Sequence, residues 1–140
     1  MLVKDWMNPR PLTVDTRATV AEAKAIMDRY WIRHLIVRDG TALVGILSDR
    51  DIRSVSLPPG GQFSQPDREA HLRRELVGAA MTKDPRTVRP DAPLRDVARL
   101  MLEYKFGGAP VVEGGRLVGI ITETDILRAF LTLTEGDEAS

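Results

Sequence analysis

The chain contains the same segment twice, and this internal repeat limits the possible folds more than any other feature. Met7 aligns with Met81 at an offset of 74 residues, and the match continues without a gap to Ile52 and Ile126. Both copies contain the tetrapeptide Leu-Val-Gly-Ile. Only two copies are present, whereas a solenoid needs at least three repeats to bury a continuous core. We therefore expect two similar halves that close face to face.

Composition and charge exclude several classes of protein. The 140 residues include no cysteine and only two histidines, so disulfides and cysteine nucleophiles are excluded and we expect no metal site. The 20 basic residues balance the 20 acidic ones, which leaves no general attraction to nucleic acid or to anionic lipid. No apolar run approaches the roughly 18 residues that a membrane span needs. We expect a soluble, cytoplasmic protein that binds neither membranes nor nucleic acid.

Each copy predicts the same order of secondary structure. A short Thr-Val segment comes first, and a helix follows whose apolar residues recur at helical spacing, as in Val20, Ala23 and Met27. Thr19 followed by Glu22 forms a capping box at the start of this helix. Two apolar strands joined by a glycine-containing turn come next, and a second helix ends the copy. The predicted unit is of the α+β class.

The repeat divides the chain into four segments. We predict a first repeat at residues 1–56, a linker with a short polar helix at 57–76, a second repeat at 77–132 and a flexible tail at 133–140. The linker has no counterpart elsewhere in the chain, and it begins with turn-forming proline and glycine residues. The two repeats together would form one module.

The motif with the most chemical content lies near the end of each copy. Ser48 and Thr122 each follow an apolar strand, and each precedes an aspartate, Asp51 or Asp125, by three positions. A hydroxyl and the free amides at a helix start can hold a phosphate, and the carboxylate can accept hydrogen bonds from two ribose hydroxyls. The same spacing is also a helix-capping signature, in which the acid bonds back to the cap amide. The residues by themselves leave both interpretations open.

With these motifs the chain resembles a pair of cystathionine β-synthase (CBS) domains, together called a Bateman module. The resemblance covers about residues 3–130 and lies in the repeated Thr-Val pairs, the glycine hairpins and the two Gly-x-x-[Ser/Thr]-x-x-Asp endings. It implies an α+β fold in which two β-α-β-β-α repeats pack through their sheets with pseudo-two-fold symmetry. It also implies two clefts that bind AMP, ADP, ATP or S-adenosylmethionine as a regulatory ligand, with no other cofactor. Many such modules are homodimers, and we expect this chain to form one.

By this resemblance, each cleft takes a hydroxyl and an acid from one repeat and backbone groups from the other. The residues implied for the first cleft are Thr13, Ile32, Arg33, His34, Thr122 and Asp125. Those implied for the second cleft are Ser48, Arg50, Asp51, Thr87, Phe106, Gly107 and Gly108. A basic pair in the first copy aligns with a glycine pair in the second, so we expect the two clefts to be occupied unequally.

Three functions compete. The first is a non-catalytic regulatory module that binds an adenosine-containing ligand and signals to an unidentified partner protein. The second is a structural dimerisation scaffold with empty clefts, because family membership alone does not ensure a working site. The third, an enzyme acting on a nucleotide, is the weakest, because the sequence has no Walker-type loop, metal cluster or nucleophile–base pair. We therefore expect no catalysis and take the regulatory module as the first hypothesis.

Overall fold

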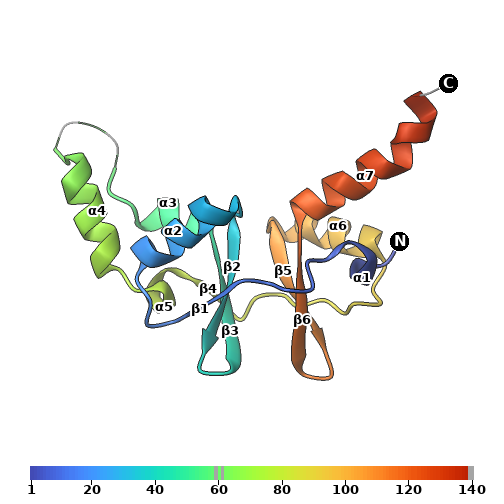
Figure 1. The fold of residues 1–140 in the computed structure, drawn as a ribbon, viewed down its shortest axis with the longest axis horizontal. Coiled ribbons are helices and arrows are strands. Elements are labelled where there is room, and N and C mark those ends of the chain that lie inside the picture. The colour runs from blue at the N-terminus through green and yellow to red at the C-terminus, as the bar shows by residue number, and fades with distance from the viewer. Residues whose placement is uncertain (59, 61, 139–140) are drawn as a thin grey trace. The chain divides into compact units, whose positions relative to one another are not determined.

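The computed structural model of the chain describes residues 1–58, 60 and 62–138 (Figure 1). The elements are α1 (Val3–Trp6), β1 (Thr13–Asp15), α2 (Val20–Tyr30), β2 (His34–Asp39), β3 (Ala42–Ser48), α3 (Asp49–Val55), α4 (Gln65–Arg74), α5 (Val77–Ala80), β4 (Thr82–Lys83), α6 (Leu94–Tyr104), β5 (Gly108–Glu113), β6 (Arg116–Thr122) and α7 (Glu123–Glu138). The run from α2 to the start of α3 recurs as α6, β5, β6 and α7 at the offset of the sequence repeat. The α+β fold with two similar repeats is confirmed.

The chain forms two compact units whose boundaries differ from those of the sequence repeats. The repeat-1 unit consists of residues 12–85, and the repeat-2 unit consists of residues 1–11 together with the chain from residue 86 onward. Val3 of α1 is fully buried in the core of the repeat-2 unit. Val77 of α5 is fully buried in the core of the repeat-1 unit. Each core is therefore completed by the short helix that begins the other copy.

The two units contain the same hairpin with different outer strands. In the repeat-1 unit the strand order is β1-β2-β3-β4, with β1 parallel to β2 and the other pairs antiparallel. Among the described residues of the repeat-2 unit, only β5 and β6 form a regular ladder. Single bridges from Val88 to Val111 and from Asn8 to Ile120 occupy the places of the outer strands. The second copy therefore has the same topology with shorter edges.

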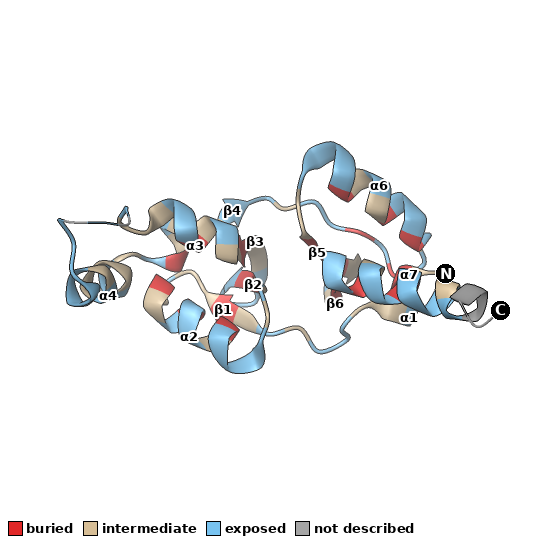
Figure 2. Cartoon of the chain, turned by 90° about the horizontal axis from the view of Figure 1, so that it is seen from above, coloured by how far each residue is buried: buried red, intermediate tan, exposed pale blue. Residues whose placement is uncertain are grey.

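The apolar helix faces predicted from the sequence pack on these strands. Val20, Ala23 and Met27 of α2 lie in one core cluster with strand residues of β2 and β3, and Figure 2 shows buried positions on α2 and on α6. Full burial of a valine or methionine side chain contributes about 1.5–3 kcal/mol. The packing of α2 and α6 on the hairpins places the C-terminal end of each helix, and therefore the loop into β2 or β5, beside the hairpin.

Outside the repeats, the polar helix predicted for the linker is present as α4, with a reciprocal capping box between Ser64 and Asp67. The end of the chain differs from the expected flexible tail, because α7 continues to Glu138, and residues 139 and 140 lie outside the described residues. The hydroxyls of Thr132 and Thr134 donate to carbonyls one turn earlier, which is compatible with the helix. Within the described part of the chain, no helix is both long and apolar enough to cross a membrane.

Candidate functional site

The end of β3 presents the first hydroxyl–acid motif. Ser48 has an extended backbone and caps α3, and its Oγ accepts a hydrogen bond from the Asp51 amide at 3.1 Å. Asp51 Oδ2 accepts from the Ser48 amide at 2.9 Å. The hydroxyl of Thr82, in β4, lies 3.3 Å and 3.4 Å from the two oxygens of the same carboxylate and donates to it. The capping box that the spacing indicates is therefore formed.

The corresponding motif at the end of β6 is more enclosed. Asp125 Oδ2 accepts from the Thr122 amide at 2.8 Å and from the Thr122 hydroxyl at 3.2 Å. Asp125 Oδ1 forms an ion pair with the guanidinium of Arg128, one helical turn along α7. Asp125 is only 4% exposed, whereas Asp51 is partly buried. Asp125 is therefore paired with an arginine side chain and is less accessible to solvent than Asp51.

Capping does not exhaust the hydrogen-bonding capacity of either motif. An ionised carboxylate offers about four acceptor positions, and a hydroxyl offers one donor and two acceptor positions. The Ser48 hydroxyl accepts from Asp51, which leaves its own hydrogen available for a ligand oxygen. The Thr122 hydroxyl donates its hydrogen to Asp125. The two motifs therefore share a geometry but differ in what they can offer a ligand.

The structure places the segment before each hairpin beside the motif of the same unit. Helices α2 and α6 both end at a residue in the left-handed conformation, Trp31 (φ 57°) and Lys105 (φ 56°), which redirects the chain. The carbonyl of Arg33 then accepts from the Asp49 amide at 3.0 Å, and His34 pairs with Ser48 across the ladder. The basic segment of the first copy is therefore a neighbour of its own motif.

The glycine segment of the second copy has the equivalent position. The carbonyl of Gly107 accepts from the Glu123 amide at 2.9 Å, and Gly108 pairs with Thr122. Phe106 is partly buried against the core of the repeat-2 unit. In each unit, therefore, one of the segments expected to face adenine lies beside one of the two hydroxyl–acid motifs. The combination of half-sites from opposite copies stays a prediction.

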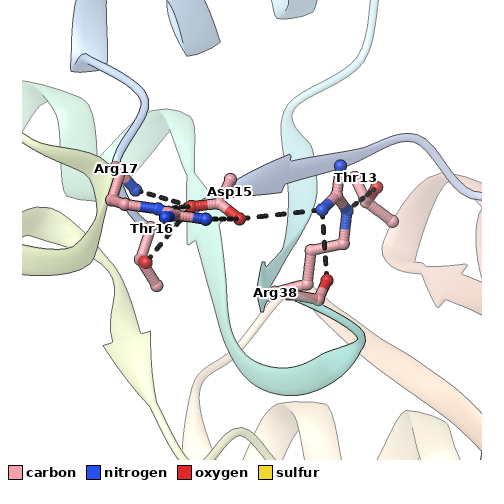
Figure 3. Close-up of polar contacts among 6 residues, drawn as sticks. Thr13, Asp15, Thr16, Arg17 and Arg38 are labelled. Atoms are coloured by element: carbon pink, nitrogen blue, oxygen red, sulfur yellow. Dashed lines mark hydrogen bonds and ion pairs between the residues drawn. The ribbon is translucent and has the colours of Figure 1, made fainter.

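Thr13 lies in a cluster of charged residues around β1 (Figure 3). Its hydroxyl accepts from Arg38 Nε at 3.1 Å, and Arg38 also lies 3.6 Å from Asp15. Asp15 accepts from Arg17 Nε at 2.9 Å, and this side-chain hydrogen bond holds the pKa of Asp15 well below its usual value. The two remaining expected residues, Arg50 and Thr87, have exposed side chains.

The second copy contains the same ion pair with the charges exchanged. Arg89 and Asp91 occupy the positions of Asp15 and Arg17, and Arg89 Nε lies 3.0 Å from Asp91 Oδ1. The side-chain hydrogen bond from Arg89 lowers the pKa of Asp91. Arg38 is replaced by Val112 in the second copy. The cluster of the repeat-1 unit therefore has one more positive charge than its counterpart.

Gly45 and Gly119 lie where another segment of the chain approaches the strand closely. A Cβ atom on Gly45 would lie 2.5 Å from Met81 Sδ and 2.8 Å from the Thr82 carbonyl oxygen. A Cβ atom on Gly119 would lie 2.7 Å from Met7 Sδ and 2.8 Å from the carbonyl oxygen of residue 8. These glycines therefore leave room for the segment that begins the other copy.

Thr82 and Arg128 contact the two acids but were not among the predicted site residues. Arg128 follows Asp125 at the i,i+3 spacing that favours ion pairs on a helix, so the sequence contained a usable signal. Thr82 is 31 residues from Asp51, and only the pairing of β4 with β3 brings the two together. No local pattern predicts that contact.

Ile32 and Arg33 also line a pocket of about 540 Å³ on the repeat-1 unit that the sequence did not predict. Its lining residues come from α2, α3 and the positions that follow them: Lys24, Met27, Asp28, Trp31, Ile32, Arg33, Asp49, Ile52, Arg53 and Ser56. Two ion pairs cross its surface, Lys24–Asp28 at 2.9 Å and Arg53–Asp49 at 3.1 Å. Among the described residues, no group of three or more Asp, Glu or His side chains is arranged to hold a metal ion.

Comparison with known proteins gives consistent matches over nearly the whole chain. The model of the CBS domain family matches at residues 3–57 and again at 75–132. A CBS domain-containing protein of Dictyostelium discoideum is 31% identical over 137 residues, which cover 96% of this chain and 94% of the relative. Three longer relatives are named as enzymes, and the chain spans between 14% and 23% of their length.

Two similar solved structures contain ligands. CBSX2 of Arabidopsis thaliana, in complex with AMP, has a TM-score of 0.74 and 32% identity over 94% of this chain and 97% of that one. The CBS domain pair of protein MJ0100, in complex with 5′-methylthioadenosine and S-adenosyl-L-methionine, has a TM-score of 0.75 and 32% identity over 93% and 95% of the two chains. The ligands named in these complexes all contain adenosine.

Proposed function

This chain belongs to the CBS domain family as a pair of CBS repeats, and from this premise we propose that it is a regulatory module for an adenosine-containing ligand. The observation that carries the proposal is the hydroxyl–acid motif present in both units, with Ser48 and Asp51 in one and Thr122 and Asp125 in the other. The solved neighbours that bind AMP or S-adenosylmethionine support the ligand class. The preferred ligand would be AMP, ADP, ATP or S-adenosylmethionine.

The proposed roles follow from the chemistry of each group. The carboxylates of Asp51 and Asp125 accept hydrogen bonds from ribose hydroxyls, because each has acceptor positions beyond its capping contacts. The Ser48 hydroxyl donates to the phosphate or the equivalent substituent, and the Thr122 hydroxyl takes the same role once it rotates away from Asp125. The segments 32–34 and 106–108 provide backbone groups for the adenine ring, with Thr13, Arg50 and Thr87 as further ligand contacts.

The same proposal includes no catalysis, a cytoplasmic location, a homodimer and a regulated partner protein. The longer relatives support regulation, since the part that matches this chain is a fraction of a protein named as an enzyme. Capture on immobilised protein with and without ATP, followed by identification of proteins whose retention changes, tests this part.

The scaffold hypothesis remains a second candidate, because both acids already serve as helix caps. An acid that only caps a helix stabilises the fold whether or not a ligand is present. In that case the clefts would stay empty, and the module would function only through assembly.

Calorimetric titration with AMP, ATP and S-adenosylmethionine separates the two candidates. We expect heat from at least one ligand, and stabilisation of about 2.7 kcal/mol at a ligand concentration 100 times the dissociation constant. The double variant Asp51→Asn/Asp125→Asn should lose this binding. Asp91→Asn is a matched control, because Asp91 is an exposed acid outside the two motifs. A wild-type protein that binds none of the three ligands would favour the scaffold.

A further inference from the structure

Both oxygens of the Asp125 carboxylate already have donors from the protein. Oδ2 accepts from the amide and the hydroxyl of Thr122, and Oδ1 accepts from the guanidinium of Arg128. The residue is only 4% exposed. A ligand that places its ribose on Asp125 therefore approaches a carboxylate whose charge is neutralised and whose Oδ1 atom is bound to a cation.

Asp51, at the equivalent position of the first copy, is less occupied. Its carboxylate accepts from the Ser48 amide at 2.9 Å and from the neutral hydroxyl of Thr82, which lies 3.3 Å and 3.4 Å from the two oxygens. Of the roughly four acceptor positions of an ionised carboxylate, about two are left, the number that two ribose hydroxyls need. Of the two motif acids, only Asp125 forms an ion pair within the described part of the chain.

A single position of the repeat accounts for the cation. Arg128 corresponds to Ser54 at the repeat offset. The Ser54 hydroxyl donates to the carbonyl oxygen of Arg50, at 3.0 Å on its own helix. An arginine three positions after an aspartate lies on the same helix face and can reach its carboxylate. The second copy therefore adds a positive charge beside an acid that both copies contain.

The two members of this ion pair differ in their access to solvent. The Arg128 side chain is 61% exposed, and the Asp125 side chain is 6% exposed. Water can therefore solvate the guanidinium when it leaves, whereas the buried carboxylate needs a replacement donor, because an unpaired buried charge is costly. Two ribose hydroxyls can supply that replacement. Opening the pair consumes part of the free energy that the ligand gains from its new hydrogen bonds.

We propose that Arg128 competes with the ligand for Asp125, so that the Asp51 site fills first and the Asp125 site fills only at a higher ligand concentration. The inference rests on the proposed function, and it adds an order of filling to the two proposed sites. A module with two such sites responds over a wider range of ligand concentration than a module with two equal sites. Adenosine is the simplest probe, because it has the ribose hydroxyls but no charge.

A reciprocal pair of substitutions tests the competition. Arg128→Gln removes the cation from the second copy, and Ser54→Arg introduces one at the equivalent position of the first. Each is made in protein that keeps one motif acid: Arg128→Gln with Asp51→Asn, and Ser54→Arg with Asp125→Asn. In calorimetric titration with adenosine and with AMP, Arg128→Gln should raise the affinity of the Asp125 site roughly tenfold, or about 1.4 kcal/mol. Ser54→Arg should lower the affinity of the Asp51 site by a similar factor.

Ionic strength provides a readout that a merely structural role of Arg128 would not change. Salt screens an ion pair whose guanidinium is exposed, but it does not act on the charge of a neutral ligand. The affinity of the Asp125 site for adenosine should therefore rise with salt, and this rise should be absent after Arg128→Gln. Arg99→Gln is the matched control, because Arg99 pairs with Asp96 at the same i,i+3 spacing outside the motifs. It should change neither the affinity nor its salt dependence, and circular dichroism checks that every variant is folded.

The possible results keep this inference separate from the ligand proposal. Weaker binding of adenosine or AMP after Arg128→Gln would mean that the arginine contacts the ligand, and it would overturn the competition. Unchanged affinity would overturn it as well. In both cases a ligand binds, so the ligand proposal stands. If the wild-type protein and every variant bind neither probe, the ligand proposal fails and the competition fails with it.

Discussion

The two units have nearly the same backbone plan and differ in how charge is distributed over it. In the repeat-1 unit the groove between α2 and α3 is charged, and the acid of the motif is partly open to solvent. In the repeat-2 unit the equivalent surface, formed by α6 and α7, carries exposed apolar side chains such as Leu102 and Leu127. The acid of its motif, Asp125, is buried and forms an ion pair with Arg128. Cores of similar composition therefore support surfaces that differ in charge and polarity. Core packing constrains the residues that point inward, whereas the residues that point outward are free to diverge.

The strongest test of the shared plan is the glycine in the middle of the second strand of each hairpin, Gly45 in β3 and Gly119 in β6. Gly45→Ala and Gly119→Ala would each place a Cβ atom 2.8 Å from a carbonyl oxygen of the other copy's first segment. We expect a loss of about 1–3 kcal/mol from overpacking, of similar size in both units. Urea unfolding measures the free energy of unfolding of each variant. The control is Gly40→Asn, at a turn glycine with φ 62° and open space around it, and it should lose less than about 1 kcal/mol. A large loss in only one unit would show that the units are not packed equivalently.

Substitution of the motif acids should reduce stability by different amounts in the two units. Asp125→Ala removes a buried carboxylate that accepts from an amide, a hydroxyl and a guanidinium, so we expect about 2–3 kcal/mol of lost stability. Asp51→Ala removes a more exposed cap and should cost about 0.5–2 kcal/mol. Thermal unfolding together with titration distinguishes capping from binding in each variant. If both lose stability and neither loses ligand affinity, the acids only cap their helices.

The exchanged ion pairs predict a smaller, pH-dependent effect. The folded pKa values of Asp15 and Asp91 lie below the unfolded value of 3.8, so their contribution to stability is present above pH 3.8. It is lost as the pH falls through the lowered folded pKa. Asp15→Asn should therefore destabilise the protein at pH 7 and lose that difference in acid, and Asp91→Asn should show the same trend with a smaller amplitude. Asp91 is exposed, Asp15 is partly exposed, and both arginine partners are exposed, so solvent screens the two ion pairs and the effects will be modest. Stability of the variants measured from pH 7 to pH 2 checks the trend, and a difference that grows in acid would contradict it.

The exposed tryptophan should show the smallest change. In Trp6→Phe protein, Trp31 is the remaining tryptophan, and its side chain is 94% exposed. Its emission and its quenching by acrylamide should therefore change little when the protein is unfolded in urea. A blue-shifted emission or weak quenching of the folded protein would contradict this exposure and would show that Trp31 is covered, for instance by a second chain.

Local pattern in the sequence was sufficient for the helices and the hairpin of each repeat, for α4 and for the capping contacts of the motif, but it did not predict α1, α5 or β4. The helix face of Val20, Ala23 and Met27, the turn glycines and the capping spacing of Ser48 and Asp51 all depend on residues within one turn or one hairpin. Such short-range preferences act before any tertiary contact forms, which is why the repeat predicted both the fold and the candidate acids. The sites as complete ligand pockets stay a prediction, because they need groups that are distant in the chain.

The tertiary structure decided which distant segments meet. The sequence assigns α1 to the first copy, yet Val3 packs in the core of the repeat-2 unit, and α5 packs in the repeat-1 unit. Packing of the segment around α5 and β4 in the repeat-1 unit also brings Thr82 to Asp51. It explains the glycine at position 45, because this segment occupies the space that a Cβ atom would need. Burial of Asp125, and the contrast between the two helix surfaces, also follow from packing. By itself the sequence determined two similar units with capped helices, because those depend on near neighbours; which segment completes each unit depends on contacts across dozens of residues that no local pattern encodes.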